Sequence, residues 1–231
     1  MAKIHPKRVM FAHMASMSAA LSHPSRVEML DLLAQGRRNV ESIAAATCLS
    51  VSNASQHLRQ LQRAGILTSA RDGKQMYYAL ADDEVIELFR SLRSFTERHS
   101  AEAEISLMRL YRSRDAVTPV TRDELVHRMK TGSTLLLDVR PELEYAAGHI
   151  PGAVNIPVDR LTDSLADLPK NQEIVAYCRG PYCVFAYEAM EILRPAGRNA
   201  RRLLGGFFEW RGARMPIETS APRSAFTPQS V

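Results

Sequence analysis

The spacing of apolar residues changes near residues 113–119, and this change limits the possible folds more than any other feature of the chain. Before it, apolar side chains recur at the three- and four-residue spacing of helices. After it, β-branched runs alternate with helical stretches, which is typical of a mainly parallel sheet covered by helices. A chain of 231 residues is long enough for two such parts. The sequence predicts domains at 1–112 and 121–218, a linker at 113–120 and a mobile tail at 219–231.

Positive charge is concentrated in the first third of the chain. Residues 1–81 hold ten Lys and Arg against four Asp and Glu, a net charge of +6. Residues 82–115 carry −2 and residues 116–231 carry +1, so the whole chain has +5. A basic first domain favours a polyanion as partner, although charge alone does not distinguish this from a generally basic surface.

Cysteine usage and hydropathy indicate the compartment. The chain has three cysteines, Cys48, Cys178 and Cys183. This number is low and odd, whereas a secreted disulfide framework needs several pairs. The apolar run 9–12 is interrupted by His13 and does not read as a signal peptide. There is no stretch of about 18 apolar residues that would span a membrane. We expect a cytoplasmic protein without membrane contact.

The first part has the pattern of a winged helix-turn-helix. Helical spacing covers residues 8–21, 24–35, 40–44 and 52–63, and strand patterns cover 66–70 and 75–80. Ala54, Leu58 and Leu61 form one apolar stripe on the fourth of these helices. The two strands are joined by Arg71-Asp72-Gly73-Lys74, in which Asp-Gly is a strong hairpin signal. Two short helices followed by a hairpin with a basic tip predict this α+β, mainly helical DNA-binding fold.

The polar face of the 52–63 helix supports DNA binding. Its side chains are hydrogen-bonding and basic, and none is acidic, whereas a solvated face usually carries both signs. Such side chains reach base edges and phosphates in a major groove. The predicted DNA-binding residues are Ser52, Asn53, Ser55, Gln56, His57, Arg59 and Arg63 on the helix, and Arg71 and Lys74 in the hairpin.

Three segments together carry a family resemblance: Ala20-Leu21-Ser22-His23-Pro24-Ser25-Arg26, Leu49-Ser50-Val51-Ser52-Asn53-Ala54-Ser55-Gln56-His57-Leu58 and Ala64-Gly65-Ile66-Leu67. With the wing-like Arg71-Asp72-Gly73-Lys74-Gln75-Met76-Tyr77-Tyr78, residues 8–98 resemble the ArsR family of bacterial repressors. The resemblance implies a homodimer that binds double-stranded DNA with one recognition helix in each half-site. The apolar stripe of residues 83–98 would then form the dimer helix, or it packs in an ordinary core.

Metal sensing, which many ArsR proteins perform, is not expected in this chain. The cysteine pair of some members would fall near Val40-Glu41-Ser42, where no cysteine stands, and the paired Asp and His ligands of the last helix are also missing. Cys48 has no neighbouring ligand and is predicted to be a small buried residue. We therefore predict no metal and no cofactor.

In the second part, a cysteine stands between a strand and a helix. Thr121 and Glu124 have capping-box spacing, and strands are predicted at 134–139, 173–177 and 202–204. The second strand runs directly into Cys178, and the loop to the next helix comprises Arg179, Gly180, Pro181, Tyr182, Cys183 and Val184. Backbone N–H groups of such a loop, and the helix that follows, can stabilise an anion. This arrangement would lower the pKa of Cys178 and produce a nucleophilic thiolate.

The surrounding segments resemble a single rhodanese domain over residues 118–218. They are Leu137-Asp138-Val139-Arg140, the run from Glu144 to Pro157 that contains Gly148-His149-Ile150-Pro151-Gly152, Tyr177-Cys178-Arg179-Gly180 and Gly205-Gly206-Phe207-Phe208-Glu209-Trp210. The resemblance implies an α/β domain and sulfurtransferase activity through a persulfide on Cys178. Asp138, Arg140, Glu144 and His149 are interpreted as structural residues.

The loop departs from the common thiosulfate-type pattern. Arg179 is its one cation, Pro181 lacks an N–H, and a second cysteine, Cys183, closes it. Weak use of thiosulfate, or a preference for a persulfide or polysulfide donor, would follow. Cys183 either resolves a persulfide on Cys178 into a bridge or only packs in the loop.

Three functions are consistent with this sequence. The first is a transcriptional repressor that senses reactive sulfur or redox state through Cys178. The second is a sulfurtransferase tethered to a DNA-binding domain, and the third is a DNA-binding protein with an inactive rhodanese fold. Operator affinity measured with and without a sulfur donor distinguishes the first from the other two.

Overall fold

The computed structural model describes residues 6–114 and 117–220 of the chain. They fall into two compact units, one up to Ile86 and one from Glu87 onward, and each is described by itself. The predicted mobile tail at 219–231 lies outside the described residues from residue 221 on.

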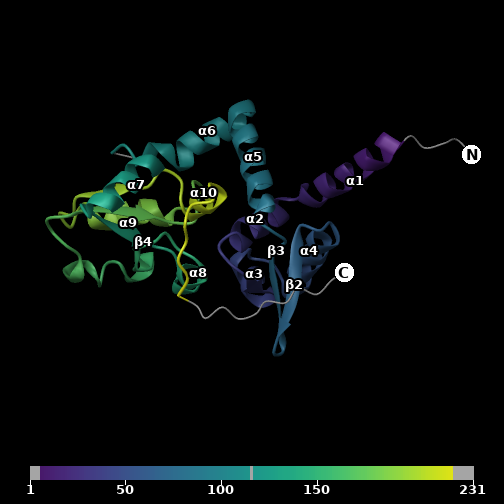
Figure 1. The fold of residues 1–231 in the computed structure, drawn as a ribbon, viewed down its shortest axis with the longest axis horizontal. Helices are drawn as coiled ribbons and strands as arrows, with labels where there is room; N and C mark the ends of the chain where they lie inside the picture. Colours follow the sequence, from purple (N-terminus) through teal and green to yellow (C-terminus); the bar gives the residue numbers. More distant parts are fainter. Residues whose placement is uncertain (1–5, 115–116, 221–231) are drawn as a thin grey trace, which may run out of the picture. The chain divides into compact units, whose positions relative to one another are not determined.

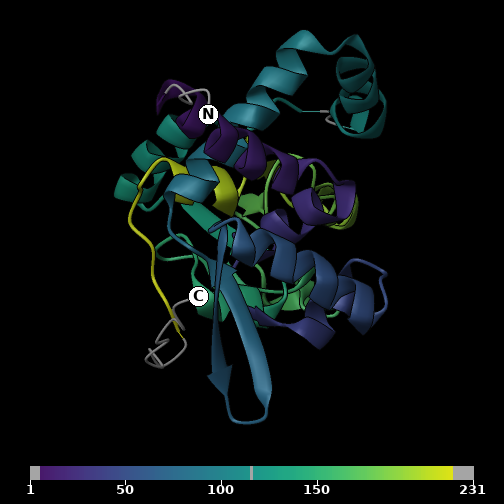
Figure 2. The ribbon, with the colours of Figure 1, turned by 90° about the vertical axis from the view of Figure 1, so that its right-hand side faces the viewer.

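The first unit is a helical domain with one small antiparallel sheet. Its elements are α1 (Pro6–Leu21), α2 (Pro24–Leu33), β1 (Arg38–Asn39), α3 (Val40–Ala46), α4 (Val51–Arg63), β2 (Leu67–Asp72) and β3 (Gln75–Leu80). The strand order is β1-β3-β2. Asp72 pairs with Gln75, so the turn is Gly73-Lys74, and Gly73 takes the left-handed φ of +60° that a two-residue turn requires. Figure 2 shows the β2–β3 hairpin extending as a narrow ribbon.

The core of the first unit follows the predicted stripe. Ala54, Leu58 and Leu61 of α4 are fully buried, and the Ser50 side chain caps the helix by accepting the N–H of Asn53 at 3.2 Å. At α2, His23 is the capping residue, because its imidazole accepts the N–H of Ser25. The winged helix-turn-helix is thus confirmed.

The second unit begins within a long helix and continues into an α/β domain. Its elements are α5 (Glu84–His99, from Glu87 on), α6 (Ala101–Leu110), α7 (Arg122–Thr131), β4 (Thr134–Asp138), α8 (Glu142–Ala147), β5 (Val154–Asn155), β6 (Glu173–Tyr177), α9 (Phe185–Leu193), β7 (Ala200–Arg202) and α10 (Phe207–Gly212). Short 3-10 turns occur at Arg112–Arg114, Val158–Arg160 and Leu165–Asp167. Figure 1 shows α5 and α6 following one another.

A four-stranded parallel sheet, in the order β5-β4-β6-β7, forms the centre of this domain. Leu137 and Ala176 belong to one core with α9, whereas Leu136 and Val175 belong to a second core with α7 and α10. Alternate strand residues therefore face opposite helical layers, as in a two-sided sheet. The α/β fold is confirmed, and so is the capping box of Thr121 and Glu124.

The strands differ from the prediction in two places. The last strand lies at Ala200–Arg202 instead of 202–204, and the two-residue β5 was not predicted because it is too short to show alternation. The chain beyond α10 is also ordered further than expected. Glu218 forms an antiparallel bridge with His149, and the N–H of Ser220 donates to the carbonyl of Ala146. Residues 219–220 of the predicted tail are therefore attached to the domain.

The boundary between the two units lies earlier in the sequence, between Ile86 and Glu87, than the predicted linker at 113–120. Residues 87–112 were assigned to the DNA-binding domain, but they belong to the second compact unit. The physical reason is that α5 makes ionic and aromatic contacts with the α/β domain, which are described below. Residues 115–116 of the 113–120 linker lie outside the described residues.

Candidate functional site

The cysteine loop spans the gap between the end of β6 and the start of α9. Tyr177 is the last residue of β6, Cys178 follows it, and Val184 is the capping residue of α9. Within the loop, the N–H of Cys183 donates to the carbonyl of Gly180 at 3.1 Å. All predicted loop residues therefore lie together at the carboxyl end of a central strand.

The first turn of α10 forms two backbone hydrogen bonds with the start of the cysteine loop. The N–H of Phe207 donates to the carbonyl of Cys178, and that of Phe208 donates to the carbonyl of Arg179, both at 2.9 Å. A Cβ on Gly206 would stand 2.4 Å from the carbonyl oxygen of Cys178, so only glycine allows this approach. The Gly205-Gly206 pair thus fixes the base of the loop.

The sulfur of Cys178 is enclosed, with 1% of the residue exposed. Its Sγ lies 3.5 Å from the carbonyl oxygen of Cys183 and 3.8 Å from that of Gly180. Burial is the largest influence and raises the pKa of Cys178 well above its usual value, and Cys183 raises it further. Backbone hydrogen bonds from Ala186 and Gly180 act in the opposite direction. The predicted anion cradle exists in part, but it does not lower the pKa of Cys178.

Cys183 is the more ionisable of the two thiols. It is half-buried, and its pKa is lowered chiefly by a hydrogen bond from the Cys178 thiol, against the effect of burial. Backbone hydrogen bonds from Arg179 and Phe185 and the charge of Arg179 lower it further. In this state of the loop the negative charge is favoured on Cys183, which the sequence did not indicate.

The loop cation is paired with a buried carboxylate. Arg179 donates from Nε and Nη2 to both oxygens of Glu144, with distances of 2.6–3.1 Å, and Glu144 is 3% exposed. The guanidinium also lies 5.1 Å from the ring of Phe185. Glu144, which we interpreted as structural, therefore sets the charge of the loop. Nearby, Arg140 and Asp138 form a separate ion pair that is fully buried.

The tip of the loop contacts α5. The hydroxyl of Tyr182 donates to Oε1 of Glu97 at 2.7 Å, and the Arg93 guanidinium lies 5.7 Å from the Tyr182 ring. Arg93 also pairs with Glu209 of α10, whose Oε2 would be 3.3 Å from a Cβ on Gly180. The cysteine loop is thus bonded to the long helix that continues into the first unit.

A second set of predicted residues lies on α4 and the hairpin. Ser52, Asn53, Gln56, Arg59 and Arg63 are exposed on α4, and Arg71 and Lys74 are exposed in the hairpin. Ser55 and His57 are half-buried. His57 packs on His23 with ring centroids 4.4 Å apart, and its pKa is lowered, first by burial and then by His23 and Arg26. His57 therefore supports the helix more than it presents a contact.

Cys48 is not the buried residue that we expected. It is exposed and adopts a φ of +53° where the chain leaves α3, so the turn directs its side chain to the surface. Within residues 6–114 and 117–220, no three His, Cys, Asp or Glu side chains are grouped so that they could hold a metal. None of the helices described is both long and apolar enough to cross a membrane.

A parallel sheet with a cysteine loop, preceded by a winged helix-turn-helix, defines a two-part class of proteins. Residues 23–69 match the family model described as bacterial regulatory protein, arsR family, and residues 121–213 match the rhodanese-like domain. The chain belongs to the ArsR family of transcriptional regulators and carries a rhodanese-like domain.

One relative resembles the chain over nearly its whole length. It is the HTH-type transcriptional regulator Rv0324 of Mycobacterium tuberculosis, with 42% identity over 94% of this chain and 95% of the relative. A sulfurtransferase of Allochromatium vinosum is 30% identical over 44% of this chain and 94% of its own length. A solved homodimeric winged helix-turn-helix domain from Mycobacterium bovis is 32% identical, with a TM-score of 0.41, over 44% of this chain and 94% of that one.

Proposed function

We propose that this regulator is a homodimeric repressor that stores sulfane sulfur as a persulfide on Cys178 and releases its operator when sulfur is bound. The observation that carries the proposal is the hydrogen bond between Tyr182, at the tip of the cysteine loop, and Glu97 of α5. A change in the loop alters a helix that is continuous with the DNA-binding unit.

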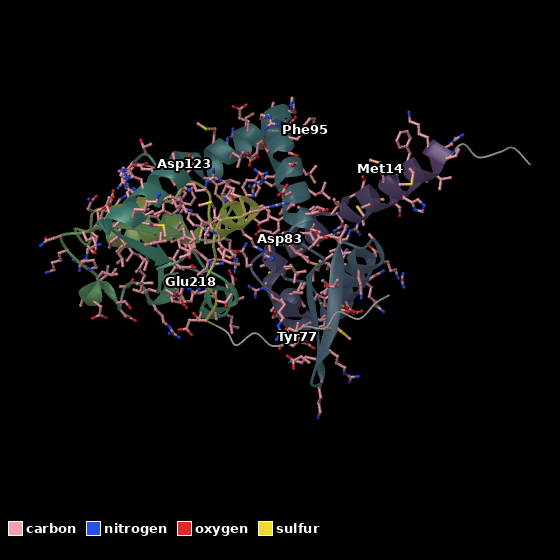
Figure 3. The ribbon with its side chains drawn as sticks, in the orientation of Figure 1. Met14, Tyr77, Asp83, Phe95, Asp123 and Glu218 are labelled. Atoms are coloured by element: carbon pink, nitrogen blue, oxygen red, sulfur yellow. The ribbon has the colours of Figure 1, made fainter. Side chains whose placement is uncertain are left out.

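Exposed apolar faces support the homodimer. Leu88, Leu92 and Phe95 recur on α5 at i, i+4 and i+7 and are 42–58% exposed. On α1, no residue is buried, and Met14 is 63% exposed. Figure 3 labels Met14 and Phe95 on these two helices. Large apolar side chains in such rows are stabilised when a second copy covers them.

Enclosure of Cys178 supports the storage role. A persulfide there would be shielded from solvent thiols, and the N–H groups of Gly180 and Ala186 would face its charge. The added sulfur needs room in a loop that is closed around Sγ, so the loop must shift. Because Tyr182 is part of that loop, the shift reaches Glu97 and Arg93.

The test is a titration of operator DNA with reduced and polysulfide-treated protein. We expect treatment to lower affinity by roughly 5- to 150-fold, the usual range for coupled sites. Tyr182→Phe removes the hydrogen bond to Glu97 but keeps the ring, and it should retain sulfur while losing most of the response. Cys48→Ser is the control and should respond like the wild type. Equal affinity of both wild-type states would overturn the sensing proposal.

In that event a tethered sulfurtransferase is the second candidate. The resemblance to a sulfurtransferase over 94% of that protein's length favours it. Turnover of thiosulfate or persulfide without any change in operator affinity would be the result that establishes it.

Donor preference depends on the carboxylate that holds Arg179. Glu144→Gln keeps the shape of the side chain but removes the charge that neutralises the guanidinium. We expect thiosulfate, a dianion, to be used about three- to tenfold faster by this variant, equivalent to roughly 1 kcal/mol of added attraction. Glu191→Gln, which removes a carboxylate paired with Arg114, is the matched control. An unchanged thiosulfate rate in Glu144→Gln, measured as kcat/KM, would contradict this role.

A further inference from the structure

The two sulfurs of the loop differ in access. Cys178 is enclosed by the carbonyls of Gly180 and Cys183 and by the core that it shares with α9. Cys183 lies at the outer edge of the same core, together with Val158 and Phe185, and is half-buried. A donor from solvent therefore meets Cys183 before Cys178.

A pocket of about 390 Å³ opens beside this edge. Phe185 and Val158 form part of its wall, and Leu143, which is 82% exposed, stands at its rim. Phe185 links the pocket to the sulfur, because its backbone also hydrogen-bonds to Cys183. The pocket is large enough for a small organic molecule, and Phe185 of its wall is two residues from Cys183 and packs against the same core.

The charges of this pocket disfavour a dianion. Among the described residues that line it, the cation is Arg160, which pairs with Glu142 at 2.6 Å, and Asp159 adds a second carboxylate. The cation of the loop itself, Arg179, is neutralised by Glu144. A donor with an apolar body and little charge fits this lining better than thiosulfate does.

We propose that Cys183 is the entry nucleophile: it takes sulfane sulfur from an organic persulfide seated in the Phe185 pocket and passes it to Cys178. This relay rests on the proposed storage role of Cys178. In this relay Cys183 reacts before the persulfide on Cys178 forms. It does not attack that persulfide afterwards to form a bridge.

Both steps balance without an added oxidant. In the first, the Cys183 thiolate attacks the terminal sulfur of R–S–SH, the donor S–S bond breaks, and R–S⁻ leaves with the electron pair. In the second, the sulfur of Cys178 attacks the outer sulfur of the Cys183 persulfide. The bond to Cys183 then breaks, and the proton of the Cys178 thiol moves to the Cys183 sulfur.

The experiment maps sulfur in full-length protein after brief reaction with benzyl persulfide and quenching with an alkylating agent. Tryptic cleavage after Arg179 places the two cysteines on different peptides. We expect sulfur on Cys183 first and on Cys178 later in the wild type. Cys178→Ser should still load Cys183, whereas Cys183→Ser and Cys183→Ala should load Cys178 at least about tenfold more slowly than the wild type.

A substitution at the rim of the Phe185 pocket tests whether the donor binds there. Leu143→Glu should slow loading from benzyl persulfide about tenfold, whereas Leu204→Glu, at an exposed apolar position outside this pocket, should not. Unchanged loading in Leu143→Glu, or equal rates with thiosulfate, would overturn the donor site.

The outcomes separate the relay from the storage role. Rapid loading of Cys178 in both Cys183 variants, with no sulfur on Cys183 in Cys178→Ser, would overturn the relay and leave storage on Cys178 intact. No sulfur on either wild-type peptide would overturn both.

Discussion

Cys178→Ser should retain less than about a tenth of the sulfur that the wild type holds after polysulfide treatment and removal of the donor. A cysteine sulfur forms a persulfide once its proton is lost, and a serine hydroxyl does not. Cys183 remains in this variant, but a persulfide on that half-buried residue exchanges with free thiols. Intact mass after brief exposure to a bulky thiol measures the retained sulfur.

The matched control for this measurement is Cys48→Ser. Cys48 is exposed in the first unit, so its loss should leave retained sulfur at the wild-type level. If sulfur instead survived in Cys178→Ser and disappeared in Cys48→Ser, the storage site would be wrong. The operator response of Cys178→Ser should be lost together with its sulfur, because no loop shift can then occur.

Local patterns were sufficient to predict most of the fold. The stripe of Ala54, Leu58 and Leu61 is buried because one helical face packs on the core, and the capping box at Thr121 formed because its partners are three residues apart. Edges of elements were less predictable. The strand β5 consists of two residues, and its pairing with β4 is a tertiary contact that no local pattern encodes.

The chemistry of the cysteine loop was predictable only in part. The position of Cys178 between a strand and a helix follows from sequence, but its pKa depends on burial and on Cys183. Desolvation outweighs two backbone hydrogen bonds, which a linear motif cannot reveal. The pairing of Arg179 with Glu144 joins residues 35 positions apart, and the contact of Tyr182 with Glu97 joins residues 85 apart. Contacts between residues so far apart in the sequence can be identified only once the three-dimensional fold is known.

Sequence-specific contacts on α4 give the second large expected effect. Asn53 and Gln56 are exposed one helical turn apart, and amide side chains of this kind bind adenine edges through two hydrogen bonds. Each change to Ala should cost roughly 1–3 kcal/mol of operator binding and relax specificity at its base pair. Because the helix cap uses the backbone N–H of Asn53 and not its side chain, the Asn53→Ala/Gln56→Ala protein should fold normally.

Lys74→Ala provides the contrast for that double variant. Its side chain is exposed at the hairpin turn, where a cation contacts phosphate and carries no sequence information. Its removal should weaken binding to specific and unrelated DNA about equally and reduce the salt slope by about 1. The double variant should instead lose operator affinity while its affinity for unrelated DNA stays the same. Titrations of both DNAs at several salt concentrations measure this difference, and unchanged operator affinity in Asn53→Ala/Gln56→Ala would remove α4 from its role as the recognition helix.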